Sequence, residues 1–382
     1  MSPTGPSQHS SQSASGSASR PGREIPVVVL AGFLGSGKTT LLNHLLRASR
    51  GTRIGAIVND FGSIEIDAMT VAGQLGDSTL SLGNGCLCCA VDASELDVYL
   101  EKLTRPAARL DVVVIEASGL AEPQELVKMV LASENPRVVY GGLVEVVDAA
   151  EYEDTRERHP EIDRHLAVAD LVVLNKTDRV ERSRLDRLRE SLGGASVVEA
   201  RYGRVDPELF FDRRPAAERV GQLAFEDLLD DDAHGPEGDH GDHCGSGCGH
   251  AAHLHTAYES VAFTSAAPMD PRRLMAFLDS RPEGLYRIKG FVDFGAADPR
   301  NRYAVHAVGR FLRFYPQPWA PGEERLTQLV LIGSRIDAEG LEKSLDAAVA
   351  SGPHDAADEA AMWGVLRYVR RDEAEQEADA DV

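Results

Sequence analysis

The octapeptide GFLGSGKT, at residues Gly32–Thr39, matches the pattern GxxxxGK[ST]. It follows the apolar run Ile25–Ala31 and leads into the amphipathic segment Thr39–Ser49, so it joins an expected strand to an expected helix. Such a loop binds phosphate because its glycines let backbone N–H groups turn inward and because the helix N-terminus is positive. We therefore expect nucleotide contacts from Gly35, Ser36, Gly37, Lys38, Thr39 and Thr40.

Two side chains of this loop and two later residues are expected beside the terminal phosphate. Lys38 can reach the β- and γ-phosphates, and the Thr39 hydroxyl can bind Mg²⁺. Glu116 ends the apolar run Asp111–Ile115, where P-loop enzymes place the acidic residue that faces Mg²⁺ directly or through water. Gly119 is a candidate γ-phosphate contact through its N–H. We expect Lys38, Thr39 and Glu116 to carry the catalysis.

Short apolar runs alternate with amphipathic segments over the first half of the chain. The runs are rich in Val, Ile and Leu and do not alternate with polar residues, which is typical of parallel strands buried on both faces. This pattern predicts an α/β, P-loop NTPase fold with a mostly parallel sheet. The expected strands are Ile25–Ala31, Arg53–Val58, Thr79–Leu82, Asp111–Ile115, Leu143–Val147, Asp170–Leu174 and Ala195–Val198, and the expected helices Thr39–Ser49, Ala93–Leu103, Pro123–Leu131 and Arg182–Leu192.

Composition divides the chain into five parts. Residues 1–24 are Ser/Gly/Pro-rich and expected to be disordered, residues 25–212 form the nucleotide-binding domain, and residues 213–256 are an acidic, His-rich linker. Residues 257–350 predict a smaller α+β domain, and residues 351–382 an acidic extension. The smaller domain's expected strands are Tyr258–Thr264, Leu285–Asp293, Ala304–Phe314 and Leu326–Ile332, and its helices Pro271–Asp279 and Glu339–Ala350.

A second motif indicates which nucleobase is bound. Asn175, Lys176, Thr177 and Asp178 follow the buried run Asp170–Leu174 and match the pattern NKxD. A carboxylate at the last position accepts from guanine N1–H and N2–H₂, and adenine offers no matching donors there, so the motif favours GTP over ATP. Ligands of open α/β sheets lie at the carboxyl ends of the strands, where this motif falls.

Three of the five cysteines, Cys86, Cys88 and Cys89, lie within four residues on a Gly-rich loop. In an extended loop Cys86 and Cys88 point the same way, so they can bind one borderline metal ion, with tetrahedral Zn²⁺ as the default. Asp60 or Asp67 is a candidate for a further ligand. Asp60 lies in the sequence Asn59–Gly62, which is expected to respond to the γ-phosphate or, alternatively, to be a plain turn. The alternatives for the cysteines are a redox pair or a buried cluster.

The linker carries a second group of metal donors. A flexible segment with so many nitrogen and sulfur donors suggests a metal-collecting arm, although the spacing fits no single rigid finger. A low-complexity spacer is the alternative. The single His44 after the phosphate loop is expected to pack rather than to bind metal. The linker donors are His240, His243, Cys244, Cys248, His250, His253 and His255.

The overall charge limits the partners. A net charge of −21 over 382 residues argues against nucleic acid, which demands a basic face. No stretch reaches the roughly 18–20 apolar residues of a membrane helix. Residues 1–22 lack the apolar segment of a signal peptide, so we expect a cytoplasmic protein without a membrane partner. Thiols stay reduced in that compartment, which favours metal sites over disulfides.

The motifs GFLGSGKTTLLN, NDFG, GNGCLCC, EASGLAEP and NKTD occur in this order. Together they resemble the CobW-like metallochaperone GTPases, whose central signature, CxCC, is matched within Gly85–Cys89. The His-rich linker and residues Arg287–Gly290 and Gly333 are similar to further family features, so the resemblance covers about residues 25–350. Asp60 stands where the family commonly has Glu. The resemblance implies a metal site at Cys86, Cys88 and Cys89, a GTP site at Lys38, Thr39, Asn175 and Asp178, and client recognition by the C-terminal domain.

These observations lead to the hypothesis of a metal carrier gated by GTP. GTP and Mg²⁺ order the segment from Asp60 to Cys89 and raise its affinity for Zn²⁺ or Co²⁺, and slow hydrolysis releases the metal to a client metalloprotein. The alternatives are a metal-sensing switch that delivers nothing, a P-loop kinase for a small molecule, and a zinc-storage protein. The client is not identified by the sequence, and a homo-oligomer is compatible with it.

Overall fold

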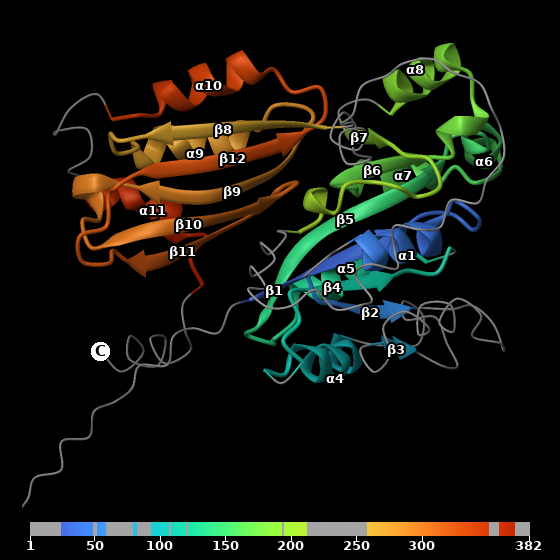
Figure 1. Cartoon of the computed structure of the whole chain (residues 1–382), viewed down its shortest axis with the longest axis horizontal. Coiled ribbons are helices and arrows are strands. Elements are labelled where there is room, and N and C mark those ends of the chain that lie inside the picture. The colour runs from blue at the N-terminus through green and yellow to red at the C-terminus, as the bar shows by residue number, and fades with distance from the viewer. Residues whose placement is uncertain are drawn as a thin grey trace, which may run out of the picture.

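The computed structural model describes residues 24–48, 52–58, 79–81, 93–106, 108–119, 121–192, 195–211, 258–350 and 359–370. These residues form two domains that lie next to each other (Figure 1). The predicted metal donors Asp60, Asp67, Cys86, Cys88 and Cys89, and those of the linker between His240 and His255, lie outside the described residues. Among the helices that are described, none is long and apolar enough to cross a membrane.

The first domain is built on a seven-stranded sheet whose order is β3-β2-β4-β1-β5-β6-β7, with every pair of neighbours parallel. The central strands are buried along almost their whole length, as their continuous Val/Ile/Leu runs require. The predicted α/β fold is therefore confirmed. The strands are β1 Ile25–Ala31, β2 Ile54–Val58, β3 Thr79–Ser81, β4 Val112–Glu116, β5 Val138–Asp148, β6 Leu171–Asn175 and β7 Ser196–Glu199.

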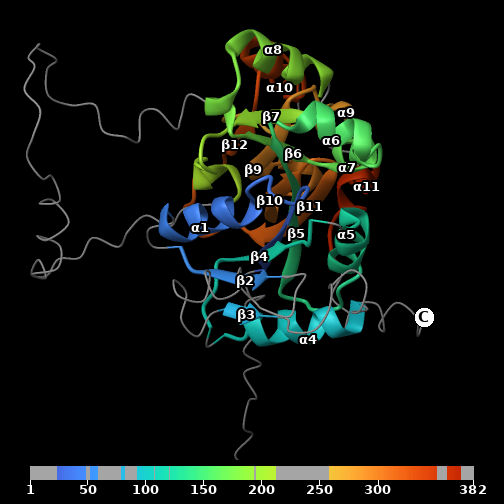
Figure 2. The same ribbon diagram turned by 90° about the vertical axis from the view of Figure 1, so that its right-hand side faces the viewer.

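Helices cover both faces of this sheet (Figure 2). On one face the buried leucines of α1 pack against Val28 and Leu30. On the other face α4 and α5 pack against Val27 and Val29, the residues that alternate with them along β1. The helices are α1 Lys38–Ala48, α4 Ala93–Thr104, α5 Pro123–Leu131, α6 Tyr152–Arg158, α7 Ile162–Val168 and α8 Arg182–Ser191.

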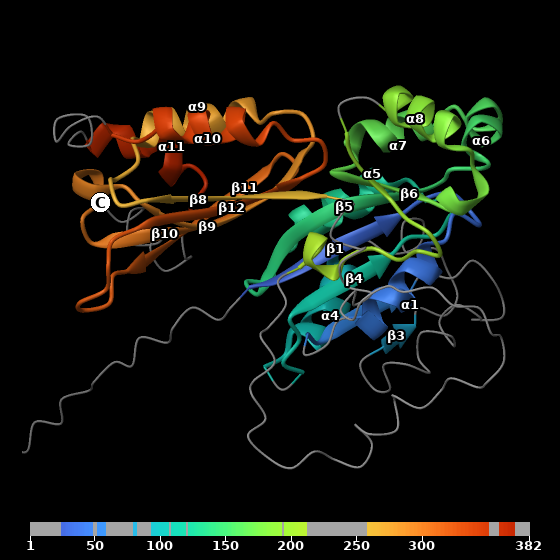
Figure 3. The same cartoon turned by 45° about the horizontal axis from the view of Figure 1, so that its top comes forward.

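The second domain is a five-stranded antiparallel sheet of order β11-β10-β9-β12-β8. Its three helices lie on one face of the sheet (Figure 3), where their apolar side chains and those of the strands form a separate core. The strands are β8 Glu259–Ser265, β9 Leu285–Asp293, β10 Asn301–Val308, β11 Phe311–Pro318 and β12 Thr327–Gly333, and the helices α9 Pro271–Ser280, α10 Ala338–Ala347 and α11 Trp363–Leu366. The predicted α+β domain is confirmed.

Two details of this domain differ from the sequence prediction. The single strand expected at Ala304–Phe314 is wrong, because the chain turns at Gly309 and forms the hairpin β10–β11. Gly309 has φ +52°, which an L-residue rarely adopts, and this marks the turn. The domain also reaches beyond residue 350, since Met362 and Val365 are buried in its core.

The two domains share apolar and polar contacts. Tyr286, Val308 and Ile332 of the second domain belong to the same buried cluster as the α1 leucines. His306 Nε2 donates to Tyr140 O at 2.9 Å, and the Tyr140 hydroxyl donates to Asp170 Oδ2 at 2.5 Å. Burial raises the pKa of the Asp170 carboxyl.

A second polar junction lies at the start of β1. Glu24 accepts a hydrogen bond from the Tyr315 hydroxyl. The same carboxylate lies 3.7 Å from Arg313 Nη1 and 3.5 Å from Arg370 Nη1. The first and the last described residues of the chain, Glu24 and Arg370, are therefore in contact.

One buried carboxyl in the first domain is unusual. Glu145 on β5 is fully buried, and neither of its carboxyl oxygens has a hydrogen-bond partner among the described residues. Burial raises the pKa of Glu145 to about 8, and the charge of Lys38 opposes that shift only in part. At neutral pH the folded protein therefore holds this carboxyl in its neutral form.

We expect replacement of Glu145 by Gln to stabilise the fold at alkaline pH and to have little effect near pH 4.5. Between the ordinary pKa of 4.5 and the raised value of about 8, the unfolded chain ionises while the folded chain keeps its proton. Stability that is present below pH 4.5 is therefore lost as the pH rises through about 8, by at most about 1.4 kcal/mol per pH unit. Glutamine stays neutral and loses none of it.

Thermal unfolding at pH 5, 6.5 and 8 measures this effect, with the exposed residue change Glu342→Gln as the control. The Tm advantage of Glu145→Gln over the unaltered chain should grow with pH and reach several degrees at pH 8. A Tm difference that is the same at all three pH values would show that Glu145 does not titrate as described.

Candidate nucleotide-binding site

The phosphate-binding loop connects β1 to α1 at the carboxyl edge of the sheet. Lys38, the first residue of α1, is 7% exposed, and its ammonium donates to Gly32 O at 2.8 Å and to Phe33 O at 3.3 Å. These two carbonyls open the loop, so Lys38 reaches across it. An ammonium held here is placed to meet the phosphates that such a loop binds.

The side chains of Thr39 and Glu116 meet at the carboxyl edge of the sheet. The Thr39 hydroxyl donates to Glu116 Oε1 at 2.6 Å, and the Glu116 side chain is buried. The register of β4 explains this contact, because Glu116 pairs with Leu30, two residues before the loop. A hydroxyl and a carboxylate are oxygen ligands of the kind that Mg²⁺ prefers, so the two side chains fit the predicted magnesium site.

Gly119 lies against the same loop. A Cβ at this position would be 2.7 Å from the Leu34 backbone nitrogen, closer than any side chain tolerates. Glycine therefore lets the chain after β4 approach the phosphate-binding loop, as expected of a residue that contacts the γ-phosphate through its backbone.

The NKxD motif is attached to the loop through Asn175. Its Nδ2 donates to Ser36 O at 2.9 Å, and its Oδ1 accepts from the Gly203 backbone N–H at 2.9 Å. Gly37, with φ +105°, makes room for it, because a Cβ there would lie 2.3 Å from Asn175 Nδ2. Asn175 thus ties the NKxD motif to the phosphate-binding loop and to the loop after β7.

The next residues present the groups that would meet the base. Lys176 has φ 60° and its ammonium bonds to Gly35 O at 2.7 Å and to Asp148 Oδ2 at 2.6 Å, so its aliphatic stem crosses the site. Asp178 is exposed, and no hydrogen bond to its side chain is found among the described residues. Its carboxylate can accept from a bound guanine.

The loop that follows β7 completes the site and was missed by the sequence analysis. Thr177 donates to Ala200 O through both its N–H, at 3.2 Å, and its hydroxyl, at 3.1 Å. This loop acts through backbone groups, so no side-chain motif marks it. One signal was available, because loops at the carboxyl ends of parallel strands carry ligand contacts and Ala200 directly follows β7.

A cavity of about 380 Å³ lies between this loop and the exposed side of α1. Thr40, which was predicted to contact the nucleotide, lines it. His44 also lines it and its Nε2 donates to Val205 O at 2.8 Å, while burial lowers the His44 pKa. His44 thus has a structural partner, in line with the predicted packing role. The other lining residues are Asn43, Arg47, Tyr202 and Arg204.

The strands that lead into the predicted metal segments end beside this site. Val58, the last residue of β2, pairs with Glu116 on one side and with Ser81, the last residue of β3, on the other. Among the described residues there is no group of three or more His, Cys, Asp or Glu side chains placed to hold a metal ion.

A parallel sheet with this loop, a hydroxyl–carboxylate pair and an NKxD motif at one edge defines a P-loop nucleotide-binding protein. The sequence comparisons agree and name the family. Residues 26–197 match the family "CobW/HypB/UreG, nucleotide-binding domain", and residues 258–349 match the "Cobalamin synthesis protein cobW C-terminal domain". The chain belongs to the CobW/HypB/UreG family and carries the CobW C-terminal domain.

Curated relatives are similar over most of this chain. It is 30% identical over 351 residues to the "Zinc chaperone CobW" of Sinorhizobium sp, covering 81% of this chain and 93% of that protein. The "Zinc chaperone CobW" of Pseudomonas aeruginosa is 31% identical over 366 residues, covering 86% and 92%. The "Zinc chaperone YjiA" of Escherichia coli is 32% identical over 196 residues, covering 49% and 61%.

Proposed function

We propose that this chain is a GTP-hydrolysing metallochaperone that binds Zn²⁺ through its CxCC cysteines and transfers it to a client protein. The observation that carries the proposal is the register at one sheet edge, where Glu116, Val58 and Ser81 lie on adjacent strands. Cys86 follows Ser81 by five residues, which span at most about 18 Å when extended. The nucleotide site and the metal-binding segment therefore begin at the same edge.

Lys38, Thr39 and Glu116 carry the phosphate chemistry. In the bound state Lys38 exchanges its bonds to Gly32 O and Phe33 O for charge-assisted bonds to the β- and γ-phosphates. Mg²⁺ neutralises charge on the phosphates, and the Thr39 hydroxyl and Glu116 hold it directly or through water. None of the motifs supplies an arginine for the transferred phosphate, so turnover without a partner is slow.

GTP rather than ATP is the substrate because of Asp178. Its carboxylate accepts from N1–H and N2–H₂ of guanine, while adenine leaves it without donors. The attachment of Asn175 to Ser36 O and Gly203 N supports this role, because it gives the base site a fixed position relative to the phosphates.

The nucleotide controls metal affinity through Thr39 and Glu116. Their hydrogen bond at 2.6 Å joins the phosphate loop to the strand that pairs with the end of β2, where the segment with Asp60 and Asp67 begins. GTP that orders this segment raises metal affinity, and metal must then raise GTP affinity by the same factor. Hydrolysis reverses the ordering and releases the metal to the client.

Zinc is the proposed cargo, and Co²⁺ is the second metal that thiolate and imidazole donors suit. Full-length relatives named zinc chaperones support this choice. We assign the cargo site to Cys86, Cys88 and Cys89 with Asp60 or Asp67, and the linker donors between His240 and His255 to metal collection. The C-terminal domain recognises the client.

A competition titration of Zn²⁺ and Co²⁺ tests the proposal, with and without Mg²⁺ and a non-hydrolysable GTP analogue. The unaltered chain should bind Zn²⁺ at least about tenfold more tightly with the analogue, a coupling within the usual range for allosteric proteins. The variant Cys86→Ser/Cys88→Ser/Cys89→Ser should lose that gain.

The matched control is Cys244→Ser/Cys248→Ser, which removes the linker thiols and should keep the nucleotide-dependent gain. Equal Zn²⁺ affinity with and without the analogue would contradict gating. A gain that is present without metal transfer to any client would favour the metal-sensing switch instead.

A further inference from the structure

The guanine motif depends on the loop after β7. Thr177 directly precedes Asp178 and places both its N–H and its hydroxyl on Ala200 O, at 3.2 and 3.1 Å. Gly203, on the same loop, donates to Asn175 at 2.9 Å. The backbone on the N-terminal side of Asp178 is therefore held by the loop that follows β7.

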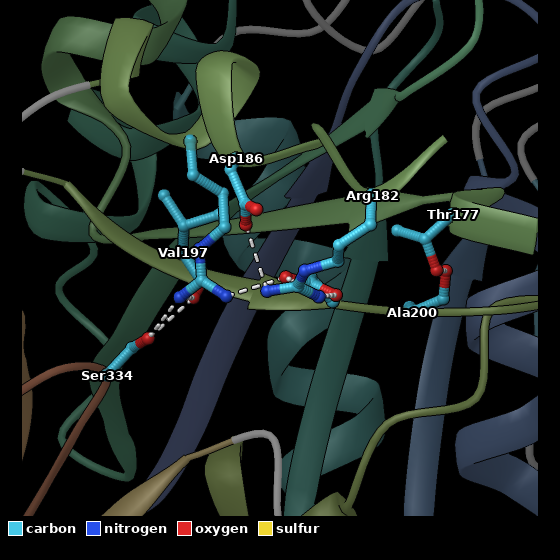
Figure 4. Close-up of polar contacts among 8 residues, drawn as sticks. Thr177, Arg182, Asp186, Val197, Ala200 and Ser334 are labelled. Atoms are coloured by element: carbon cyan, nitrogen blue, oxygen red, sulfur yellow. Dashed lines mark hydrogen bonds and ion pairs between the residues drawn. The ribbon is translucent and has the colours of Figure 1, made fainter. Parts of the chain in front are cut away.

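β7 is the last strand of the sheet and pairs with β6 alone. The second domain contacts its outer edge. The Ser334 hydroxyl, which is 6% exposed as part of that residue, donates to Val197 O at 2.7 Å, and the Ser196 hydroxyl donates to Gly284 O at 2.7 Å. Figure 4 shows Ser334 beside Val197 of β7, and Thr177 beside Ala200, which directly follows that strand.

Arg189 on α8 contacts both Ser334 of the second domain and the end of β7. Its Nη2 donates to the Ser334 hydroxyl at 3.2 Å, and its Nη1 donates to Glu199 Oε1 at 2.7 Å. Glu199 is the residue directly before Ala200, and Arg182 holds its other oxygen at 3.0 Å. The Arg189 guanidinium thus links Ser334 of the second domain to Glu199, the last residue of β7 before the loop that contains Ala200.

We infer that Ser334 and Arg189 are positioning residues for guanine recognition, through which the second domain controls the selectivity of the nucleotide site. They hold β7 at Val197 and Glu199, and β7 leads directly to Ala200, which accepts both hydrogen bonds of Thr177, the residue before Asp178. Hydrogen bonds to the base tolerate displacements of only a few tenths of an ångström. A client that displaces Ser334 from Val197 would therefore weaken guanine binding.

This inference rests on the proposed GTP binding and predicts a change in selectivity rather than in general affinity. Inosine triphosphate lacks the 2-amino group of guanine and so donates to Asp178 only through N1–H. The ratio of the Kd for inosine triphosphate to the Kd for GTP measures the missing contact. We expect Ser334→Ala and Arg189→Gln each to lower this ratio by about threefold to tenfold, the range expected for one hydrogen bond.

In both variants the Kd for inosine triphosphate should rise by a smaller factor than the Kd for GTP, because inosine has only its N1–H bond to Asp178 to lose and the phosphate loop is untouched. Ser334→Thr keeps the hydroxyl and should restore the ratio. The control Ser344→Ala removes an exposed hydroxyl that bonds only to Gly340 O, at 2.7 Å within α10, and should leave the ratio unchanged.

A double variant tests whether the contacts act through the same strand. Thr177→Val removes the hydroxyl bond to Ala200 O without a large change in volume. If Ser334 acts through Ala200, the loss of GTP affinity in Ser334→Ala/Thr177→Val should be smaller than the product of the two single losses. A loss equal to the product would overturn the inference.

The remaining outcomes are equally decisive. If the unaltered chain binds GTP and neither Ser334→Ala nor Arg189→Gln changes the ratio, this inference fails while the proposed function stands. If the unaltered chain binds neither nucleotide, the proposed function fails and this inference with it. Should Ser334→Ala not fold, Arg189→Gln alone and in combination with Thr177→Val still measures the effect.

Discussion

Lys38→Ala should lower the affinity for GTP by about 10-fold to 150-fold, because a hydrogen bond to a charged group contributes about 1.5–3 kcal/mol. The structure gives the reason, because the Lys38 ammonium is nearly buried within the phosphate-binding loop, 2.8 Å from Gly32 O. A water molecule in the place of the ammonium would bind the phosphates less strongly. Titration with a fluorescent GTP analogue measures the loss.

The position also requires lysine rather than positive charge alone. A planar guanidinium cannot take the place of the compact ammonium that reaches both loop carbonyls with the same geometry, so we expect Lys38→Arg to lose most of the affinity as well. The matched control is Lys343→Ala, which removes an exposed lysine of α10. GTP affinity within tenfold of the unaltered chain in Lys38→Ala would show that the loop does not bind phosphate as described.

Asp178→Asn should reduce GTP affinity by about 100-fold or more and create affinity for xanthosine triphosphate. Sites built to hydrogen-bond a substrate reject an analogue that leaves a polar group unpaired, by factors of about 10⁴ in favourable cases. Xanthine carries a carbonyl where guanine has its 2-amino group. An asparagine can donate to that carbonyl, whereas the Asp178 carboxylate repels it.

Competition of GTP and xanthosine triphosphate against one fluorescent nucleotide measures both changes. Asp346→Asn, on the exposed side of α10, is the control with the same loss of charge. If Asp178→Asn loses affinity for GTP but gains no affinity for xanthosine triphosphate, the carboxylate has a structural role instead. If the variant keeps its affinity for GTP, the NKxD motif does not recognise the base.

Apolar runs predicted much of the fold because the strands of the first sheet are buried on both faces. The bounds of β1, β9 and α5 match the expected ranges, and most other elements differ by one or two residues. β5 was predicted too short, as Leu143–Val147, because Gly141 and Gly142 interrupt its apolar run. Gly142 lies against the second domain, where a Cβ would be 2.7 Å from Val308.

The short polar helices α6 and α7 were not predicted, for a different reason. α6 and α7 each have seven residues, and α6 buries only Tyr152. An amphipathic pattern needs a window of about 11 residues, or three turns, to become visible in a sequence. The hairpin at Gly309 was missed because an isolated glycine in an apolar run was not interpreted as a turn.

The candidate site was predictable where side chains do the chemistry. The pattern at Lys38 and Thr39, the acidic Glu116 and the base-reading Asp178 depend on residue type, and the structure brings the first three together. The Ala200 loop and Ser334 contribute backbone groups and one small hydroxyl. Neither a carbonyl nor a single serine leaves a recognisable pattern, so only the folded chain reveals them.

The contact between Glu24 and Arg370 has a consequence for how the chain is arranged. The two domains are joined along the chain between residues 211 and 258, and they are joined again where its first and last described residues meet. Glu24 directly precedes β1, which ends at the phosphate-binding loop. A movement of the second domain can therefore reach that loop through the seven residues of β1, in addition to the apolar and polar contacts that join the domains elsewhere.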